Sequence, residues 1–234
     1  MVGDTWYEIV LPPFVILAAT CLAAVLLWLV RGKLAELVRQ LGLQKISAFG
    51  VDLQFVEQQT AQAYKNQGLP PPSQEDKAAV RDAVQFLAPL AAQTLVLWVD
   101  DTPGNNVVER STFLSWRVGV QTARTTDEGL LELEDSRQSF DLVISDWSRP
   151  NDSVGDDSEP AGLVLLKRMR DLELERPPRV IFYHGVVGSK ELARRRRLAH
   201  EAGAVGTTGS PGELFRWTLI ELARRVGKAG WAGV

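Results

Sequence analysis

The 234-residue sequence contains a single cysteine, Cys21, and only two histidines. One cysteine excludes an internal disulfide framework, and with two histidines it is too few for a zinc cluster of thiolates and imidazoles. The chain also lacks an excess of charge, because 26 basic and 29 acidic residues leave a net charge of −3. This balance does not suit a protein that coats nucleic acid, so we expect no nucleic-acid partner.

A long stretch without any charged side chain runs from Ile9 to Val30. As a helix its 22 residues span roughly 33 Å, enough to cross a hydrocarbon core of about 30 Å. The alternative is a cleaved signal peptide, but residues 1–8 carry two acidic and no basic side chains, and no small-residue cleavage site follows. The pattern therefore predicts a transmembrane helix over residues 9–30.

The flanking charges predict the orientation of this helix. Residues 31–45 hold four basic side chains against one acidic one, a net charge of +3, whereas residues 1–8 carry −2. Positively charged flanks stay in the cytoplasm. We therefore expect a single-pass protein of the cell (inner or plasma) membrane, with residues 1–8 as a short extracytoplasmic N-terminus and the rest cytoplasmic.

Residues 31–74 are predicted to form a juxtamembrane segment and linker. An apolar stripe at helical spacing predicts a short helix over residues 31–45. The alternating pattern of residues 46–55 predicts a small hairpin or bent strand, and the polar stretch 57–67 is predicted to be helical.

A cluster of helix breakers, GLPPPSQ at residues 68–74, predicts the boundary of the main domain. Ser73 and Asp76 have the spacing of a capping box, in which each side chain bonds the backbone of the other residue. They predict the start of a connecting helix over residues 75–92.

From Thr94 onward, short apolar runs alternate with helical patterns. Runs such as LVLWVD are typical of strands buried on both faces of a parallel sheet. Five strands and five helices predict a doubly wound α/β domain of flavodoxin-like type over residues 93–227, followed by a tail at 228–234. The predicted strands are 95–100, 120–123, 141–147, 179–184 and 204–208, and the predicted helices are 105–117, 126–136, 162–172, 189–202 and 212–226.

Three aspartates are predicted to meet at the carboxyl edge of this sheet, where ligands bind in such folds. Asp100 and Asp101 end the first strand, and Asp146 ends the third, its neighbour in a flavodoxin-like order. Helix capping is the alternative role for the first two. Three converging carboxylates cannot all stay ionised without a cation, and all-oxygen ligation suits Mg²⁺.

At these residues the sequence resembles the receiver domain of bacterial response regulators, over roughly residues 94–227. The resemblance implies that Asp146 is the phospho-acceptor and that Asp100 and Asp101 hold Mg²⁺ with it. It also implies that the backbone carbonyl of Ser148 completes the metal site. The matching motifs are VDD at 99–101, DLVISD at 141–146, AG at 161–162, GA at 203–204 and SPGEL at 210–214.

Two positions depart from the family's pattern. His184 stands where the family has Ser or Thr at the end of the fourth strand, and Ser210 stands where it has Lys. Ser210, followed by Pro211 and Glu213, fits the start of the last helix. His184 is predicted to be a structural hydrogen-bonding residue or a phosphate or metal partner, and acidic neighbours would favour its protonated form.

Two further segments stand out by their charge. Residues 148–160 are longer than the family's equivalent and hold one basic and four acidic residues; we expect a flexible surface loop there. The basic run 194–197 is predicted to be a solvated helix face that also suits anionic lipid or an acidic partner.

These features predict a membrane-tethered, receiver-like signalling protein with a degenerate site. It would bind Mg²⁺ weakly, act through contact with a histidine kinase or an effector, and not be an enzyme beyond slow self-phosphorylation on Asp146. Two alternatives stay open: an active phospho-acceptor fed by a histidine kinase, and a nucleotide-hydrolysing effector that resembles TIR domains. Homo-oligomers are expected, because the family commonly pairs through its fourth and fifth helices.

Overall fold

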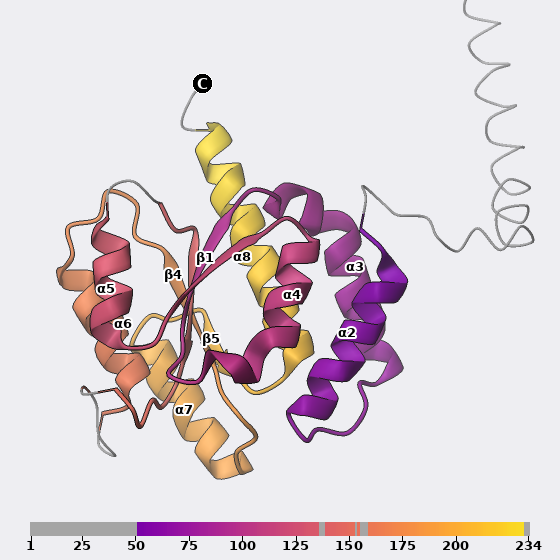
Figure 1. Ribbon diagram of the computed structural model, residues 1–234, viewed down its shortest axis with the longest axis horizontal. Coiled ribbons are helices and arrows are strands. Elements are labelled where there is room, and N and C mark those ends of the chain that lie inside the picture. The colour runs from indigo at the N-terminus through magenta and orange to yellow at the C-terminus, as the bar shows by residue number, and fades with distance from the viewer. Residues whose placement is uncertain (1–50, 136–138, 153, 155–158, 232–234) are drawn as a thin grey trace, which may run out of the picture. The chain divides into compact units, whose positions relative to one another are not determined.

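The computed structural model describes residues 51–135, 139–152, 154 and 159–231 (Figure 1). They all belong to one compact unit, Ser47–Val234. The predicted extracytoplasmic N-terminus, transmembrane helix and juxtamembrane helix, together with Cys21, lie outside the described residues. In the part of the chain that the structure describes, no helix combines the length and apolar character needed to cross a bilayer.

A five-stranded sheet with all neighbouring strands parallel forms the centre of the unit, in the order β2-β1-β3-β4-β5. This order confirms the predicted flavodoxin-like arrangement, and every predicted strand is present within a few residues. The strands are β1 Leu95–Val99, β2 Gly119–Ala123, β3 Leu142–Asp146, β4 Arg179–Tyr183 and β5 Gly206–Thr208.

Helices cover both faces of the sheet, as Figure 1 shows, with α5, α6 and α7 on one side and α4 and α8 on the other. The last helix extends beyond its predicted end at residue 226, into the segment predicted as a tail. The helices that follow β1 are the short 3-10 helix η1 Pro103–Asn106, then α4 Val107–Ser115, α5 Thr126–Glu134, α6 Ala161–Asp171, α7 Ser189–Glu201 and α8 Pro211–Trp231.

The core consists of two hydrophobic clusters, one on each face of the sheet. Alternate side chains of β1, β3 and β4 enter opposite clusters, because successive residues of a strand point to opposite faces. On the α8 side, Phe113, Trp116 and Phe215 pack with ring centroids 5.5 to 5.7 Å apart. Aromatic pairs at such distances add about 0.5–1.5 kcal/mol each beyond their buried area.

The structure differs from the predicted hairpin at residues 46–55. Residues 53–55 are the first turn of helix α2 Leu53–Asn66, and residues 46–50 lie outside the described part. Asp52 caps this helix, since its side chain accepts hydrogen bonds from the backbone N–H groups of Gln54 and Phe55. The strand prediction is therefore wrong for these residues, because the cap and the buried helical face override a short alternating pattern.

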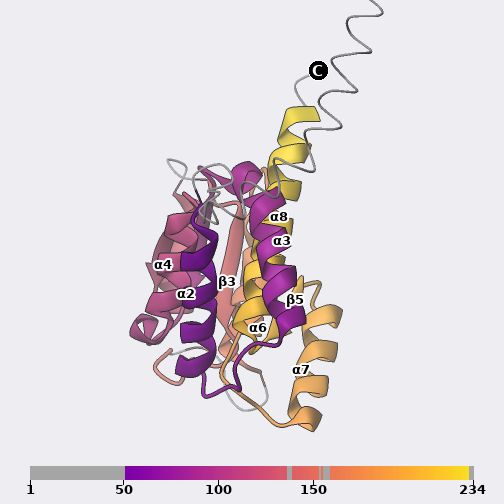
Figure 2. The same ribbon diagram turned by 90° about the vertical axis from the view of Figure 1, so that its right-hand side faces the viewer.

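The connecting helix is confirmed as α3 Gln74–Ala91, with the predicted capping box between Ser73 and Asp76. Residues 68–74, the predicted boundary, connect α2 to α3. In Figure 2, α2 lies between α4 and α3, and α8 lies beside α3. Both helices thus pack on the sheet domain within the same compact unit.

Candidate functional site

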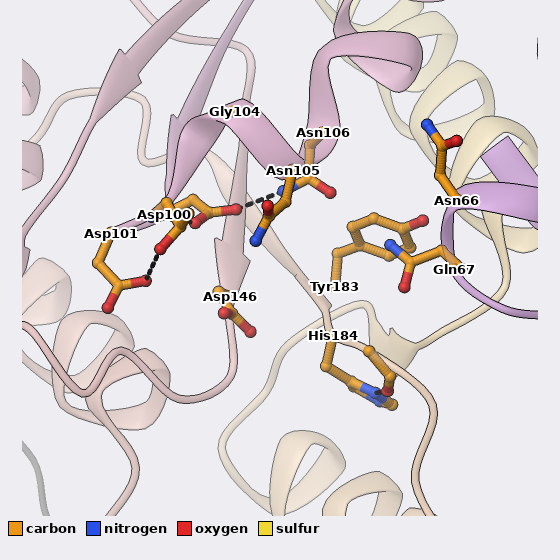
Figure 3. Close-up of a pocket in the computed structure, with 12 residues that line it drawn as sticks. Asn66, Gln67, Asp100, Asp101, Gly104, Asn105, Asn106, Asp146, Tyr183 and His184 are labelled. Atoms are coloured by element: carbon orange, nitrogen blue, oxygen red, sulfur yellow. Dashed lines mark hydrogen bonds between the residues drawn. The ribbon is translucent and has the colours of Figure 1, made fainter.

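A cavity of about 590 Å³ opens at the carboxyl edge of the sheet (Figure 3). Two adjacent strands, β1 and β3, deliver the acidic residues to it, since Asp146 ends β3 and Asp100 follows β1. Because parallel strands end at one edge, side chains far apart in sequence meet here. The lining residues are Asn66, Gln67, Asp100, Asp101, Thr102, Gly104, Asn105, Asn106, Asp146, Tyr183, His184 and Gly185.

The structure brings the three predicted aspartates together. Asp100, Asp101 and Asp146 each offer a carboxylate oxygen, and these atoms lie within 4.8 Å of one another. Oxygen ligands at this spacing, with room for water beside them, fit a hard divalent cation such as Mg²⁺. These three side chains would hold the ion, and the ion would supply positive charge between them.

Asp100 is the buried member of the trio, with 4% of its surface exposed. One carboxylate oxygen accepts a hydrogen bond from the backbone N–H of Thr102 at 2.7 Å, and the other accepts one from the side-chain amide of Asn106. Burial raises the pKa of this carboxyl group, and the neighbouring Asp101 raises it further. Asp100 thus both organises the turn after β1 and faces the cavity.

Asp101 connects the cavity to the loop after β3. Its Oδ2 accepts two hydrogen bonds of 3.0 Å from Asn151, one from the backbone N–H and one from the side-chain amide. The loop after β3 therefore contacts the acidic site through Asn151.

Asp146 has the strongest electrostatic perturbation of the three. Burial, followed by repulsion from Asp100, raises the pKa of the Asp146 carboxyl group to about 7, although the backbone N–H groups of Trp147 and Ser148 oppose the shift. A bound cation would remove this repulsion. Ser148 therefore contacts Asp146 through its amide, and the metal-ligand role of its carbonyl stays a prediction.

A glycine lets helix α6 approach the site closely. A Cβ atom at Gly162 would lie 2.7 Å from the backbone oxygen of Asp146 and 3.0 Å from the ring of Phe182. The glycine of the AG motif that begins α6 therefore has a steric reason.

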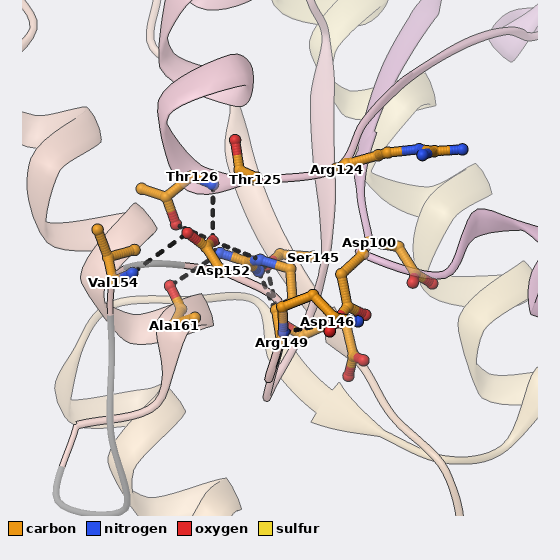
Figure 4. Close-up of polar contacts among 12 residues, drawn as sticks. Asp100, Arg124, Thr125, Thr126, Ser145, Asp146, Arg149, Asp152, Val154 and Ala161 are labelled. Atoms are coloured by element: carbon orange, nitrogen blue, oxygen red, sulfur yellow. Dashed lines mark hydrogen bonds and ion pairs between the residues drawn. The ribbon is translucent and has the colours of Figure 1, made fainter.

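Arg149 is buried beside Asp146 (Figure 4), and no pattern in the sequence indicates its role at the site. Its Nε donates to Asp152 Oδ2 at 3.0 Å, and both side chains are almost wholly inaccessible. The prediction of a flexible surface loop is therefore wrong for Arg149 and Asp152, because this ion pair anchors the start of the insertion inside the protein.

The remaining donors of Arg149 are also satisfied. Nη1 donates to Ser145 Oγ at 2.7 Å and to the backbone oxygen of Asp146 at 3.0 Å. Nη2 donates to Thr126 Oγ1 at 2.7 Å and to the backbone oxygen of Ala161 at 3.0 Å. One guanidinium thus joins β3, α5 and α6 at the base of the acidic site.

His184 lies at the end of β4 and is buried. Its Nδ1 pairs with the backbone oxygen of Gly185 at 2.6 Å, whereas Nε2 has no hydrogen-bond partner among the described residues. Burial lowers the pKa of the His184 imidazole, and Arg195 lowers it further. The acidic neighbour Glu191 raises this pKa, as expected, but desolvation outweighs it and favours the neutral imidazole.

Ser210 starts helix α8, as its sequence context predicts. Its Oγ accepts a hydrogen bond of 3.4 Å from the backbone N–H of Glu213, and its backbone N–H donates to Thr208 Oγ1 at 2.9 Å. The Ser210 hydroxyl also pairs with the hydroxyl of Tyr64 from α2, at 3.0 Å. A neutral pair of hydroxyls thus occupies the position where the resemblance places a lysine.

A second buried acidic residue, Glu109 of α4, lies behind the cavity wall. The Tyr183 hydroxyl donates to Glu109 Oε1 at 2.9 Å, and neither side chain reaches the surface. Burial raises the pKa of the Glu109 carboxyl group, and the hydrogen bond from Tyr183 opposes this shift. No sequence pattern indicates this buried group, because its partners lie in different elements.

The basic run 194–197 on α7 is only partly solvated. Arg194 and Arg195 both pair with Glu191, at 3.0 and 2.8 Å, and Arg195 lies over the ring of Trp147, 5.4 Å from its centroid. Arg196 lies 3.9 Å from Glu213, and Arg197 lies 3.9 Å from Glu201.

No protein-family model and no curated protein matches the chain. Similar solved structures include a CheY-like response regulator receiver domain protein from Methanospirillum hungatei, with 21% identity, 58% of this chain and 98% of that chain covered, and a TM-score of 0.44. The chemotaxis response regulator CheY4 of Vibrio cholerae has 22% identity, coverages of 57% and 98%, and a TM-score of 0.41. The non-phosphorylated HemR receiver domain from Leptospira biflexa has 23% identity, coverages of 57% and 94%, and a TM-score of 0.39.

Proposed function

We propose that this protein is a receiver-like signalling protein whose acidic site binds a divalent cation and which acts through contacts with other proteins. The observation that carries the proposal is the convergence of Asp100, Asp101 and Asp146 within 4.8 Å, at the carboxyl edge of a sheet with the order β2-β1-β3-β4-β5. The partners we propose are a histidine kinase upstream or an effector downstream.

We further propose that phosphoryl transfer at this site is weak. Transfer to a carboxylate depends on positioning and on neutralising charge around the phosphoryl oxygens. The position implied for a lysine holds Ser210, whose hydroxyl is engaged with Tyr64, and the buried His184 has a lowered pKa and supplies no fixed positive charge. The cation would thus be the main positive charge at the site.

Cation binding should strengthen as the pH rises. With a pKa of about 7, Asp146 is largely protonated at pH 6 and ionised at pH 8, and a proton on the carboxyl group competes with the cation. We expect calorimetric titration with Mg²⁺ to give clearly tighter binding at pH 8 than at pH 6.

Substitutions define the controls for this titration. Asp101→Ala should abolish binding in the millimolar range, whereas Asp82→Ala, an exposed position on α3, should leave it unchanged. Binding with the same affinity at both pH values, or binding that survives Asp101→Ala, would contradict the assignment of the site.

We also propose that the protein is tethered to the cell membrane by residues 9–30, with residues 31–234 in the cytoplasm. The support is the uncharged run and the +3 charge that follows it. A reporter fused at residue 234 should be active only in its cytosolic version. Activity of a reporter that works only outside the cytoplasm would overturn this orientation.

We also propose that the protein forms homo-oligomers, and the packing of α3 limits how its helices can pair. Helix α3 packs along α8. Pairing through the last two helices, α7 and α8, would therefore have to include or displace α3.

A further inference from the structure

Helix α2, which precedes the sheet in the sequence, ends at the acidic cavity. Asn66 and Gln67, at its carboxyl end, line the same space as Asp100 and Asp146. Figure 3 shows the amide of Gln67 reaching from this helix toward Tyr183. The cavity wall opposite the carboxylates is therefore built partly by a segment outside the sheet domain proper.

Tyr64 is the first anchor that holds this end of α2 in place. Its side chain is 7% exposed, and its hydroxyl lies 3.0 Å from Ser210 Oγ. The start of α8 leaves room for the ring, because a Cβ atom at Gly212 would lie 2.9 Å from the Tyr64 hydroxyl. The Tyr64 side chain therefore fits against the start of α8 because Ser210 is small and Gly212 has no side chain.

Gln67 is the second anchor. Its side-chain amide reaches toward Tyr183 (Figure 3) and lowers the pKa of both Tyr183 and its buried partner Glu109, against the effect of burial. Tyr183 is the residue of β4 that pairs in register with Asp146 of β3. Gln67, at the carboxyl end of α2, therefore lies near Tyr183, the neighbour of Asp146 in the sheet.

We propose that α2 completes the cation site, with Gln67 as an outer ligand that accepts hydrogen bonds from the waters of the bound cation. This inference rests on the proposed cation binding. Mg²⁺ keeps several waters when only a few carboxylates bind it, and a cavity of about 590 Å³ has room for them. Gln67 lines this cavity, so its amide oxygen can accept hydrogen bonds from these waters.

Coupling between the cation and α2 follows from this arrangement. A ligand that binds more tightly when α2 is docked must stabilise the docked helix by the same factor. Occupancy of the site would therefore stabilise the docked position of α2, Leu53–Asn66.

The affinity of the full-length protein for Mg²⁺ alone, measured by calorimetric titration at pH 8, tests the inference. Gln67→Ala should weaken binding about tenfold, the scale found when an outer partner of a metal site is removed. Tyr64→Phe keeps the ring packed against α8 but removes the hydroxyl that pairs with Ser210, and it should weaken Mg²⁺ binding a few-fold. Gln58→Ala, an exposed glutamine on the same helix, is the matched control and should bind as the unaltered protein does.

Hydrogen exchange of the α2 amides gives an independent readout. Mg²⁺ should slow exchange in the last turn of α2 in the unaltered protein, and this protection should be lost in Asp101→Ala. The inference would be overturned if Gln67→Ala and Gln58→Ala bind Mg²⁺ equally well, or if Mg²⁺ leaves hydrogen exchange in α2 unchanged. Either result would leave the proposed function standing. No Mg²⁺ binding by the unaltered protein would overturn both.

Discussion

Replacing Arg149 by alanine is expected to lower the free energy of unfolding by about 3–5 kcal/mol, the usual cost of removing one partner of a buried ion pair. The substitution leaves the carboxylate of Asp152 inside the protein without its cation, and it removes the donors that serve Ser145 and Ala161. Urea denaturation followed by tryptophan fluorescence measures the loss. Because Arg149 also bonds the backbone of Asp146, we expect Mg²⁺ affinity to fall with stability.

An exposed ion pair supplies the matched control. Arg168 and Asp127 lie 2.6 Å apart, but both side chains are about half exposed, so Arg168→Ala should cost less than about 1 kcal/mol. Adding Asp152→Asn to Arg149→Ala should recover part of the loss, since no uncompensated charge then stays buried. If Arg149→Ala costs no more than Arg168→Ala, Arg149 does not anchor the site.

The second large effect concerns reactivity. Ser210→Lys is expected to raise the rate at which a small phosphodonor phosphorylates Asp146 by about 10²-fold, because one preorganised charge aimed at the transition state contributes on that scale. The hydroxyl of Tyr64, 3.0 Å from Ser210 Oγ, restricts the room for a lysine. In saturating Mg²⁺, the gain should therefore be larger when Ser210→Lys is combined with Tyr64→Phe, which removes this hydroxyl but keeps the ring.

Gln85→Lys controls for the added charge, because it places a lysine on an exposed position of α3. Its rate should equal that of the unaltered protein. If neither version of the Ser210→Lys protein reacts faster than this control, residue 210 does not stand at the family's lysine position.

The features that the sequence predicts correctly depend on local patterns. The strands follow from short apolar runs, and the start of α3 follows from the spacing of Ser73 and Asp76. The meeting of Asp100, Asp101 and Asp146 follows from one further step, since parallel neighbouring strands end at the same edge.

The site features that the sequence does not predict depend on contacts between distant segments. Arg149 is recognisable only when α5, β3 and α6 surround it, and the pairing of Tyr64 with Ser210 joins residues 146 positions apart. The charge state of His184 depends on how deeply it is buried, which its neighbours in the sequence do not reveal. The strand prediction fails at residues 53–55 because an alternating pattern this short also fits the first turn of a helix.

We propose that the site keeps its cation ligands but has lost efficient phosphoryl transfer. The most direct test is the rate at which Asp146 becomes phosphorylated when the unaltered full-length protein meets a small phosphodonor in saturating Mg²⁺, with Asp146→Asn as the blank. We predict labelling that is very slow and incomplete over hours, although Mg²⁺ is bound. Rapid, stoichiometric phosphorylation of Asp146 would contradict the claim and identify an active phospho-acceptor.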